Sequence, residues 1–169
     1  RSTLLHCLLY WEQHAPQQIY LTQPYPDGSV QDWTWQQVGD EVRRIAQYLQ
    51  SVGLPAHSNI ALLGRNSAHW IMADLAIWMA GHVTVPLYPT LNADTAAYVL
   101  EHSDAKLLII GKMDGKADGW QHIKTIIPAD LPLIATPLAP NELSTKPQWK
   151  QLIQTVPPLA QPSLPPLDQ

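Results

Sequence analysis

The sequence has few of the features that mark secreted, membrane-spanning or nucleic-acid-binding proteins. It contains one cysteine, Cys7, so neither an intrachain disulfide nor a cysteine-based metal site can form. No apolar run reaches the roughly 18 residues of a membrane span, and the first residues lack the pattern of a signal peptide. Lysine and arginine are not clustered, and a net charge of -4 argues against a nucleic-acid partner. We therefore expect one soluble, cytoplasmic domain.

Three common ligand-binding or catalytic motifs are also missing. The first predicted strand-to-helix turn reads Gly64-Arg65-Asn66-Ser67, which is not the Gly-x-Gly-x-x-Gly loop of dinucleotide-binding proteins. A Walker loop needs a glycine five residues before a Gly-Lys pair. Lys106 stands at that place before Gly111-Lys112, and Ile110 stands there before Gly115-Lys116. The Gly-x-Ser-x-Gly turn of hydrolases is absent as well.

Proline divides the chain into two parts. Of its 16 prolines, ten lie in residues 128–166 and six lie in the longer stretch before them. We therefore predict an α/β part over residues 1–127 and a Pro-rich segment over residues 128–169. Within that segment, residues 156–169 alternate proline with leucine and glutamine, which excludes a regular helix or a central strand. An extended connector is expected there.

Regular elements are predicted from the start of the chain. Two strands are expected at residues 19–22 and 30–34, joined through a loop that contains Pro26-Asp27-Gly28. They follow a helix over residues 3–14, whose predicted apolar face consists of Leu4, Leu8 and Trp11.

The next helix has clear boundary signals. Thr34 and Gln37 have the spacing of a capping box, in which each side chain satisfies the other residue's backbone N–H. Gly53 is expected to end the helix, and Asp40 and Arg44 can form an ion pair one turn apart. One apolar stripe is predicted from the spacing of Val38, Val42, Ile45, Leu49 and Val52.

The middle of the chain alternates strands and helices with short links. Such a β-α-β-α-β order predicts parallel strands joined by right-handed crossovers. We therefore expect an α/β fold with a parallel sheet covered by helices. The strands are predicted at residues 59–63, 83–87 and 106–110, and the helices at residues 67–80 and 93–102.

Histidine and tryptophan do not reveal a site by themselves. The sequence has seven histidines, but His69 and Asp74 are five residues apart and point to different faces of one helix. Zinc sites need convergent ligands, so we interpret the histidines as surface or capping residues and predict no metal site. For Trp33, Trp35, Trp70 and Trp78, core packing is favoured over a stacking surface. The residues alone thus predict an α/β domain without catalytic residues.

Five segments carry a resemblance to a known family. They are Trp33-Thr34-Trp35-Gln36-Gln37-Val38, Met79-Ala80-Gly81-His82-Val83-Thr84-Val85-Pro86-Leu87-Tyr88, Asn66-Ser67-Ala68-His69-Trp70, Val85-Pro86-Leu87-Tyr88-Pro89-Thr90-Leu91 and Glu101-His102-Ser103-Asp104-Ala105-Lys106. Together they resemble the AMP-forming acyl-CoA synthetases, in the long-chain fatty acid–CoA ligase branch of the adenylate-forming enzymes. The first two are similar to that family's first two core motifs, and the others match its fatty-acyl members. The resemblance runs from about Leu4 to Ile110.

The resemblance implies a parent enzyme that uses ATP and Mg²⁺ to convert a fatty acid into an acyl-adenylate and then transfers the acyl group to CoA. The family's phosphate-binding loop would be expected just after the Pro-rich segment. The chain is therefore expected to need the remainder of its own protein and to be inactive alone. A cytoplasmic location is implied, with membrane association of the intact protein left open.

The resemblance also implies a place near the CoA channel. It assigns this place to Pro89 and Thr90, and to Lys112 and Lys116 in the loop after the next strand. Acetyl-CoA synthetase relatives have Gly-Gly where this chain has Pro89-Thr90. The two lysines could meet phosphates as point charges, and ordinary solvated loop lysines are the alternative.

Other readings of the whole chain stay open. A medium-chain or aryl acid ligase is the alternative within the enzyme class. A stand-alone, non-catalytic α/β binding or interaction domain is the alternative from another class. If the chain is a fragment, apolar surface left without its partner would favour homo-oligomers.

Overall fold

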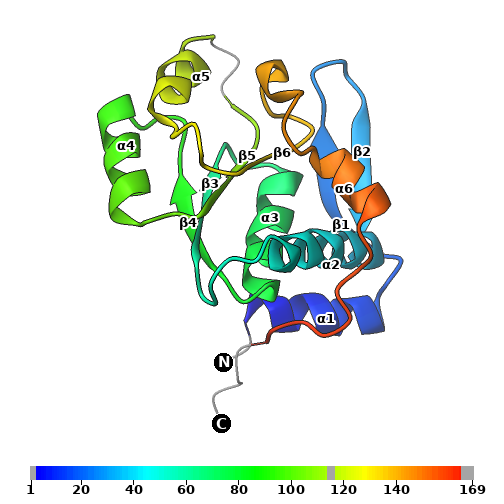
Figure 1. Ribbon diagram of the computed structural model, residues 1–169. Coiled ribbons are helices and arrows are strands. Elements are labelled where there is room, and N and C mark those ends of the chain that lie inside the picture. The colour runs from blue at the N-terminus through cyan, green and yellow to red at the C-terminus, as the bar shows by residue number, and fades with distance from the viewer. Residues whose placement is uncertain (1–2, 114–116, 165–169) are drawn as a thin grey trace.

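A computed structural model of the chain describes residues 3–113 and 117–164, and it contains two sheets (Figure 1). The larger sheet is parallel, with strand order β4-β3-β5-β6, and the smaller is the antiparallel pair β1–β2. This confirms the predicted α/β fold with a covered parallel sheet. The strands are β1 (Ile19–Pro24), β2 (Val30–Thr34), β3 (Asn59–Leu63), β4 (Val83–Leu87), β5 (Leu107–Ile110) and β6 (Leu133–Ala135).

Helices cover both faces of the parallel sheet (Figure 1). On one side lie α2 and α3, with α1 across their ends, and on the other side lie α4 and α5. The helices are α1 (Leu4–His14), α2 (Trp35–Ser51), α3 (Ala68–Met79), α4 (Ala93–His102), α5 (Ala117–Ile123) and α6 (Trp149–Thr155), and two short 3₁₀ turns are η1 (Lys124–Ile126) and η2 (Asn141–Leu143).

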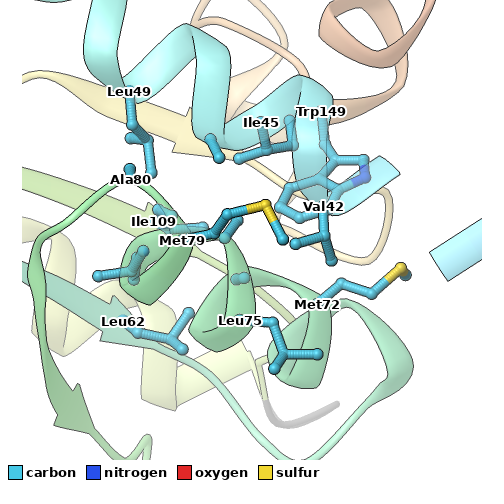
Figure 2. Packing of buried hydrophobic residues seen from close by; sticks show 14 of the residues in the cluster. Val42, Ile45, Leu49, Leu62, Met72, Leu75, Met79, Ala80, Ile109 and Trp149 are labelled. Carbon is cyan, nitrogen blue, oxygen red and sulfur yellow. The ribbon is translucent and has the colours of Figure 1, made fainter. Parts of the chain in front are cut away.

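The central strands divide their side chains between two cores. Because successive residues of a strand point to opposite faces, Ile60 and Leu62 of β3 join the core under α2 and α3, while Ala61 and Leu63 join the core under α4 and α5. Figure 2 shows the first core, in which side chains of α2 point towards α3 and the sheet. A strand buried on both faces reads as a continuous apolar run, as residues 60–63 do.

Helix α2 forms as predicted. The Thr34–Gln37 capping box is present, and Arg44 pairs with Asp40 at 2.9 Å. Gly53 follows the helix with φ of +79°, the left-handed conformation that glycine tolerates best. Val38, Val42, Ile45 and Leu49 are completely buried. Val52 is the exception, because it lies just beyond the helix and is partly exposed.

The predicted apolar face of α1 is wrong in two of its three members. Leu8 is buried, but Leu4 and Trp11 are exposed, and Leu5 takes the second core position instead. Leu5 and Leu8 are three residues apart and therefore share one helix face. The helix itself begins as its capping residue suggests, with the side chain of Thr3 accepting the His6 N–H.

The four tryptophans singled out in the sequence differ in burial. Trp33 is buried, as core packing requires, whereas Trp78 on α3 is 47% exposed. Trp35 is half-buried and stacks on Tyr20 with ring centroids 3.7 Å apart. None of the helices within residues 3–113 and 117–164 has the length and apolar character needed to cross a membrane.

The Pro-rich segment contributes elements that the sequence did not predict. Strand β6 pairs with β5, and Trp149 at the start of α6 is completely buried in the same core as α2 and α3. Residues 156–164, the described part of the chain after α6, form no helix or strand, and the Leu159 N–H donates to the Arg43 carbonyl at 3.1 Å. The boundary between residues 127 and 128 stays a prediction.

Truncation of Trp149 measures how much the Pro-rich segment contributes to stability. We expect Trp149→Ala to lower the free energy of unfolding by about 3–5 kcal/mol, because a fully buried ring leaves a cavity. Trp78→Ala is the matched control and should cost much less, since that ring is half exposed. Urea unfolding followed by circular dichroism measures both. Equal losses would contradict a core role for Trp149.

Candidate functional site

The candidate site lies where three parallel strands end. Strands β3, β4 and β5 are in parallel register, so Leu63, Leu87 and Ile110 lie side by side at one edge of the sheet. In open α/β sheets, ligands bind outside this carboxyl edge. The residues that follow the three strands are therefore the first to consider.

A shallow pocket of about 400 Å³ is present at this edge. It brings together Pro89, Thr90 and Lys112, three of the four residues assigned from the sequence. The fourth, Lys116, lies outside the described residues. Three further residues line the pocket and were not predicted, although each also follows a strand end: Arg65, Asn66 and Tyr88.

Backbone hydrogen bonds tie the three loops of the pocket together. The Gly64 N–H donates to the Leu87 carbonyl at 3.2 Å, and the Gly111 N–H donates to the Leu63 carbonyl at 2.7 Å. The Arg65 N–H donates to the Lys112 carbonyl at 2.7 Å. The two cationic residues of the pocket are thus held by a direct bond between their main chains.

The pocket's described lining residues have one sign of charge. They include Arg65 and Lys112 but no aspartate or glutamate, although the chain as a whole has a net charge of -4. Thr90 is exposed and supplies a hydroxyl, while Pro89 is buried. Such a set suits an anionic group, with the ammonium of Lys112 acting as a point charge.

The first turn of α3 begins beside the pocket, and two of its N–H groups are already used. Ser67 caps the helix by accepting the Trp70 N–H at 3.1 Å. The buried side-chain oxygen of Gln23 accepts the Ala68 N–H at 2.9 Å. The protein itself satisfies these two donors, and the formal charges of the described pocket lining are those of Arg65 and Lys112.

Two glycines lie in close contact where the loops after β3 and β5, which supply pocket residues, approach each other. A Cβ atom on Gly64 would lie 3.1 Å from the Gly111 Cα atom, whereas a Cβ on Gly111 would lie 3.7 Å from its nearest neighbours. A separation of 3.1 Å is shorter than an ordinary van der Waals contact. The neighbouring atom belongs to the main chain, so it cannot move aside as a flexible side chain would. Only glycine at position 64 therefore lets the β3 and β5 loops approach this closely.

Alanine substitution tests this contact. We expect Gly64→Ala to destabilise the fold by about 1–3 kcal/mol, because overpacking forces backbone shifts, and to displace the Lys112 main chain. Gly111→Ala is the control and should cost less, since its added methyl meets atoms at ordinary distance. Thermal unfolding of the two variants gives the comparison, and a larger loss for Gly111→Ala would contradict it.

One histidine prediction needs correction. His69 was expected at the surface or at a cap, but it is 3% exposed, and His82 is buried too. His69 lies in the first turn of α3 between the rings of Trp33 and Trp149, at centroid distances of 5.3 and 5.6 Å. Burial disfavours the charged imidazolium and lowers the His69 pKa to about 4.

The buried imidazole should make stability depend on pH. The unfolded chain protonates His69 below about pH 6.5, whereas the folded chain does so only below about pH 4. The free energy of unfolding therefore rises with pH across this window, by at most about 3 kcal/mol from this group. Burial raises the pKa of neighbouring Glu41, which contributes in the opposite direction.

Replacing the imidazole isolates its contribution. We expect His69→Gln to flatten the dependence of unfolding free energy on pH between pH 4 and 6.5, while the exposed His102→Gln leaves it unchanged. Urea unfolding at several pH values provides the data. An unaltered slope in His69→Gln would show that His69 is not the group responsible.

No group of three or more His, Cys, Asp or Glu residues within the described ranges could hold a metal ion.

Comparison with known proteins finds one matching family model and several similar proteins. The family model described as AMP-binding enzyme matches residues 10–166. Long chain acyl-CoA synthetase 4 of Arabidopsis thaliana is 34% identical over 77 residues, which are 46% of this chain and 12% of the plant protein. The human mitochondrial medium-chain acyl-CoA ligase ACSF2 is 29% identical over 127 residues, 75% of this chain and 20% of that protein.

The fold has solved counterparts. A benzoate CoA ligase from Burkholderia xenovorans LB400 superposes over 100% of this chain and 32% of its own, with a TM-score of 0.72 and 21% sequence identity. The chain thus spans about a third or less of the proteins compared here.

Proposed function

The chain belongs to the AMP-binding enzyme family, and we propose that it is the N-terminal part of an AMP-forming long-chain fatty acid–CoA ligase. The observation that carries this proposal is the family match over residues 10–166. The parent enzyme would use ATP and Mg²⁺ to form an acyl-adenylate and would then pass the acyl group to CoA. Because the chain covers only a small share of its relatives, these activities are assigned to the whole protein.

Long-chain specificity is the finer part of the proposal. It is supported by the plant relative named as a long chain acyl-CoA synthetase and by the Tyr88-Pro89-Thr90 segment that resembles this branch. A medium-chain ligase or an aryl acid ligase is the alternative, favoured by the human relative and by the structural counterpart that acts on benzoate. The residues that select the acid would lie in the remainder of the protein.

We assign the pocket at the carboxyl edge of the sheet to a phosphate-bearing part of CoA. Lys112 would neutralise phosphate charge, Thr90 would offer a hydroxyl, and the buried ring of Pro89 would form part of the wall. The described lining residues fit this group because their charges are positive. Lys116 is proposed as a second cation from the same loop.

We propose that the 169-residue chain is inactive alone. Stabilising the charge of phosphoryl transfer requires positioned cations and phosphate-binding groups, and these are expected in the remainder of the protein. A cytoplasmic location is proposed, and membrane association is left to experiment. Homo-oligomers could form through exposed apolar residues such as Leu4, Trp78 and Tyr98. The competing reading is a non-catalytic binding domain.

Enzyme kinetics on the protein encoded by the whole gene tests the proposal. We expect pyrophosphate release with ATP, Mg²⁺ and palmitate, weaker release with octanoate or benzoate, and none from the 169-residue chain. Strongest release with octanoate or benzoate would replace the long-chain assignment by one of its alternatives. Activity of the 169-residue chain would contradict its proposed inactivity, and a whole protein without activity would favour the binding domain.

A lysine substitution tests the CoA assignment separately. Lys112→Ala should raise the KM for CoA about tenfold, the loss of roughly one charge-assisted contact, while palmitate-dependent ATP–pyrophosphate exchange stays unchanged. The exposed Lys146→Ala serves as the control. Loss of the exchange reaction without a change in the KM for CoA would place Lys112 elsewhere in the mechanism.

A further inference from the structure

A second, larger groove includes His69 of the first turn of α3 in its lining. It has a volume of about 990 Å³ and runs between the β1–β2 hairpin and the region of η2 and α6. Its lining includes carboxylates, aromatic rings and a buried histidine from four parts of the chain. The residues that matter for the argument are Tyr25, Asp27, Trp33, Glu41, His69 and Lys150.

Glu41 is the carboxylate that faces this groove from α2. It accepts hydrogen bonds from two indoles, Trp33 Nε1 and Trp149 Nε1, the latter at 3.0 Å. The two arginines nearby on α2 are already used by other carboxylates. Arg43 binds Glu12 at 2.5 and 2.8 Å, and Arg44 binds Asp40 at 2.9 Å.

Glu41 therefore has no cationic partner among the described residues. Burial raises its pKa despite the two indole donors, so the ionised form is poorly compensated. Each carboxylate oxygen has one lone pair beyond the bond it already accepts. A cationic hydrogen-bond donor would both compensate the negative charge of Glu41 and occupy a remaining lone pair of its carboxylate.

His69 also lines the groove, and one of its ring nitrogens is buried without a hydrogen-bond partner. The side chain is 3% exposed, and this nitrogen is Nδ1. A neutral imidazole has one acceptor nitrogen and one donor N–H. Its low pKa keeps the ring neutral near pH 7, so that it can accept a hydrogen bond from a cation without repelling it.

The rim of the groove is also negative. Asp27 accepts hydrogen bonds from the N–H and the hydroxyl of Ser29 at 2.9 and 2.6 Å, and these bonds lower its pKa and keep it ionised. Burial raises the pKa of the Tyr25 phenol, and the charges of Glu41 and Asp27 act in the same direction. An aromatic ring beside two carboxylates is a favourable setting for an organic cation.

We propose that this groove binds an organic cation with N–H donors, an ammonium or guanidinium group, held by Glu41 and His69. Nothing in the proposed ligase activity requires such a site, so the inference stands apart from that proposal. The cation can come from a small molecule or from a lysine or arginine side chain of a polypeptide. Lys150 opposes binding, because it is the cation among the described lining residues.

Calorimetric titration of the 169-residue chain tests the site. The probes are butylguanidinium, its neutral isostere butylurea, and the peptide acetyl-Gly-Arg-Gly-amide. We expect saturable binding of butylguanidinium and none of butylurea. Tighter binding of the peptide would identify a polypeptide side chain as the source of the cation, and equal or weaker binding would identify a small molecule.

Matched variants locate the binding energy. Glu41→Gln should weaken butylguanidinium binding about tenfold, the loss of one charge-assisted contact. Asp40→Asn, which removes the adjacent carboxylate of α2, should leave it nearly unchanged. Lys150→Ala at the exposed rim should strengthen butylguanidinium binding about threefold, because it removes a charge of the same sign as the ligand. This variant still tests the proposal if Glu41→Gln fails to fold.

Three results would overturn the proposal. They are equal heats for butylguanidinium and butylurea, equal weakening by Glu41→Gln and Asp40→Asn, and an absence of saturable binding in a Lys150→Ala variant whose circular dichroism is that of the wild type.

Discussion

Burial of the parallel sheet on both faces is the constraint on which the rest of the structure depends. Ile60 and Leu62 of β3 face one core and Ala61 and Leu63 face the other, so neither layer of helices can be removed without exposing the same strand. Parallel strands need crossover helices, and those helices supply the two layers. The arrangement also fixes where the loops emerge. The carboxyl ends of the parallel strands lie at one edge of the sheet. The loops that follow β3, β4 and β5 therefore emerge together, and they line the cationic pocket.

The pocket includes the loop just before α3 and the groove includes His69 in the first turn of that helix, but the two differ in character. The pocket depends on main-chain contacts between glycine-containing loops, with Arg65 and Lys112 as its charges. The groove depends on side chains gathered from the hairpin, α2, α3 and α6, with Glu41 as its central charge.

The sequence predicted the strands and helices of residues 3–113 because their signals are local. The strands at residues 59–63 and 83–87 and the capping box at Thr34 depend on neighbouring residues alone. Strand β6 was missed because its three residues lie between Pro132 and Pro137, and prolines just outside an edge strand look like a connector. The pocket residues Pro89, Thr90 and Lys112 came from family resemblance. The groove could not be predicted, since its members meet only through tertiary packing.

The hydrogen bond between Glu41 and Trp149 has a further consequence for how the chain folds. Its partners are 108 residues apart, so forming it closes a very long loop. The entropy of closure grows only slowly with loop length, and the final stability loses little. The folding rate is affected more, because contacts distant in sequence slow the search for the native topology. The polar centre at Glu41 is complete only once α6 has packed against the hairpin and α2, so it depends on the whole chain topology.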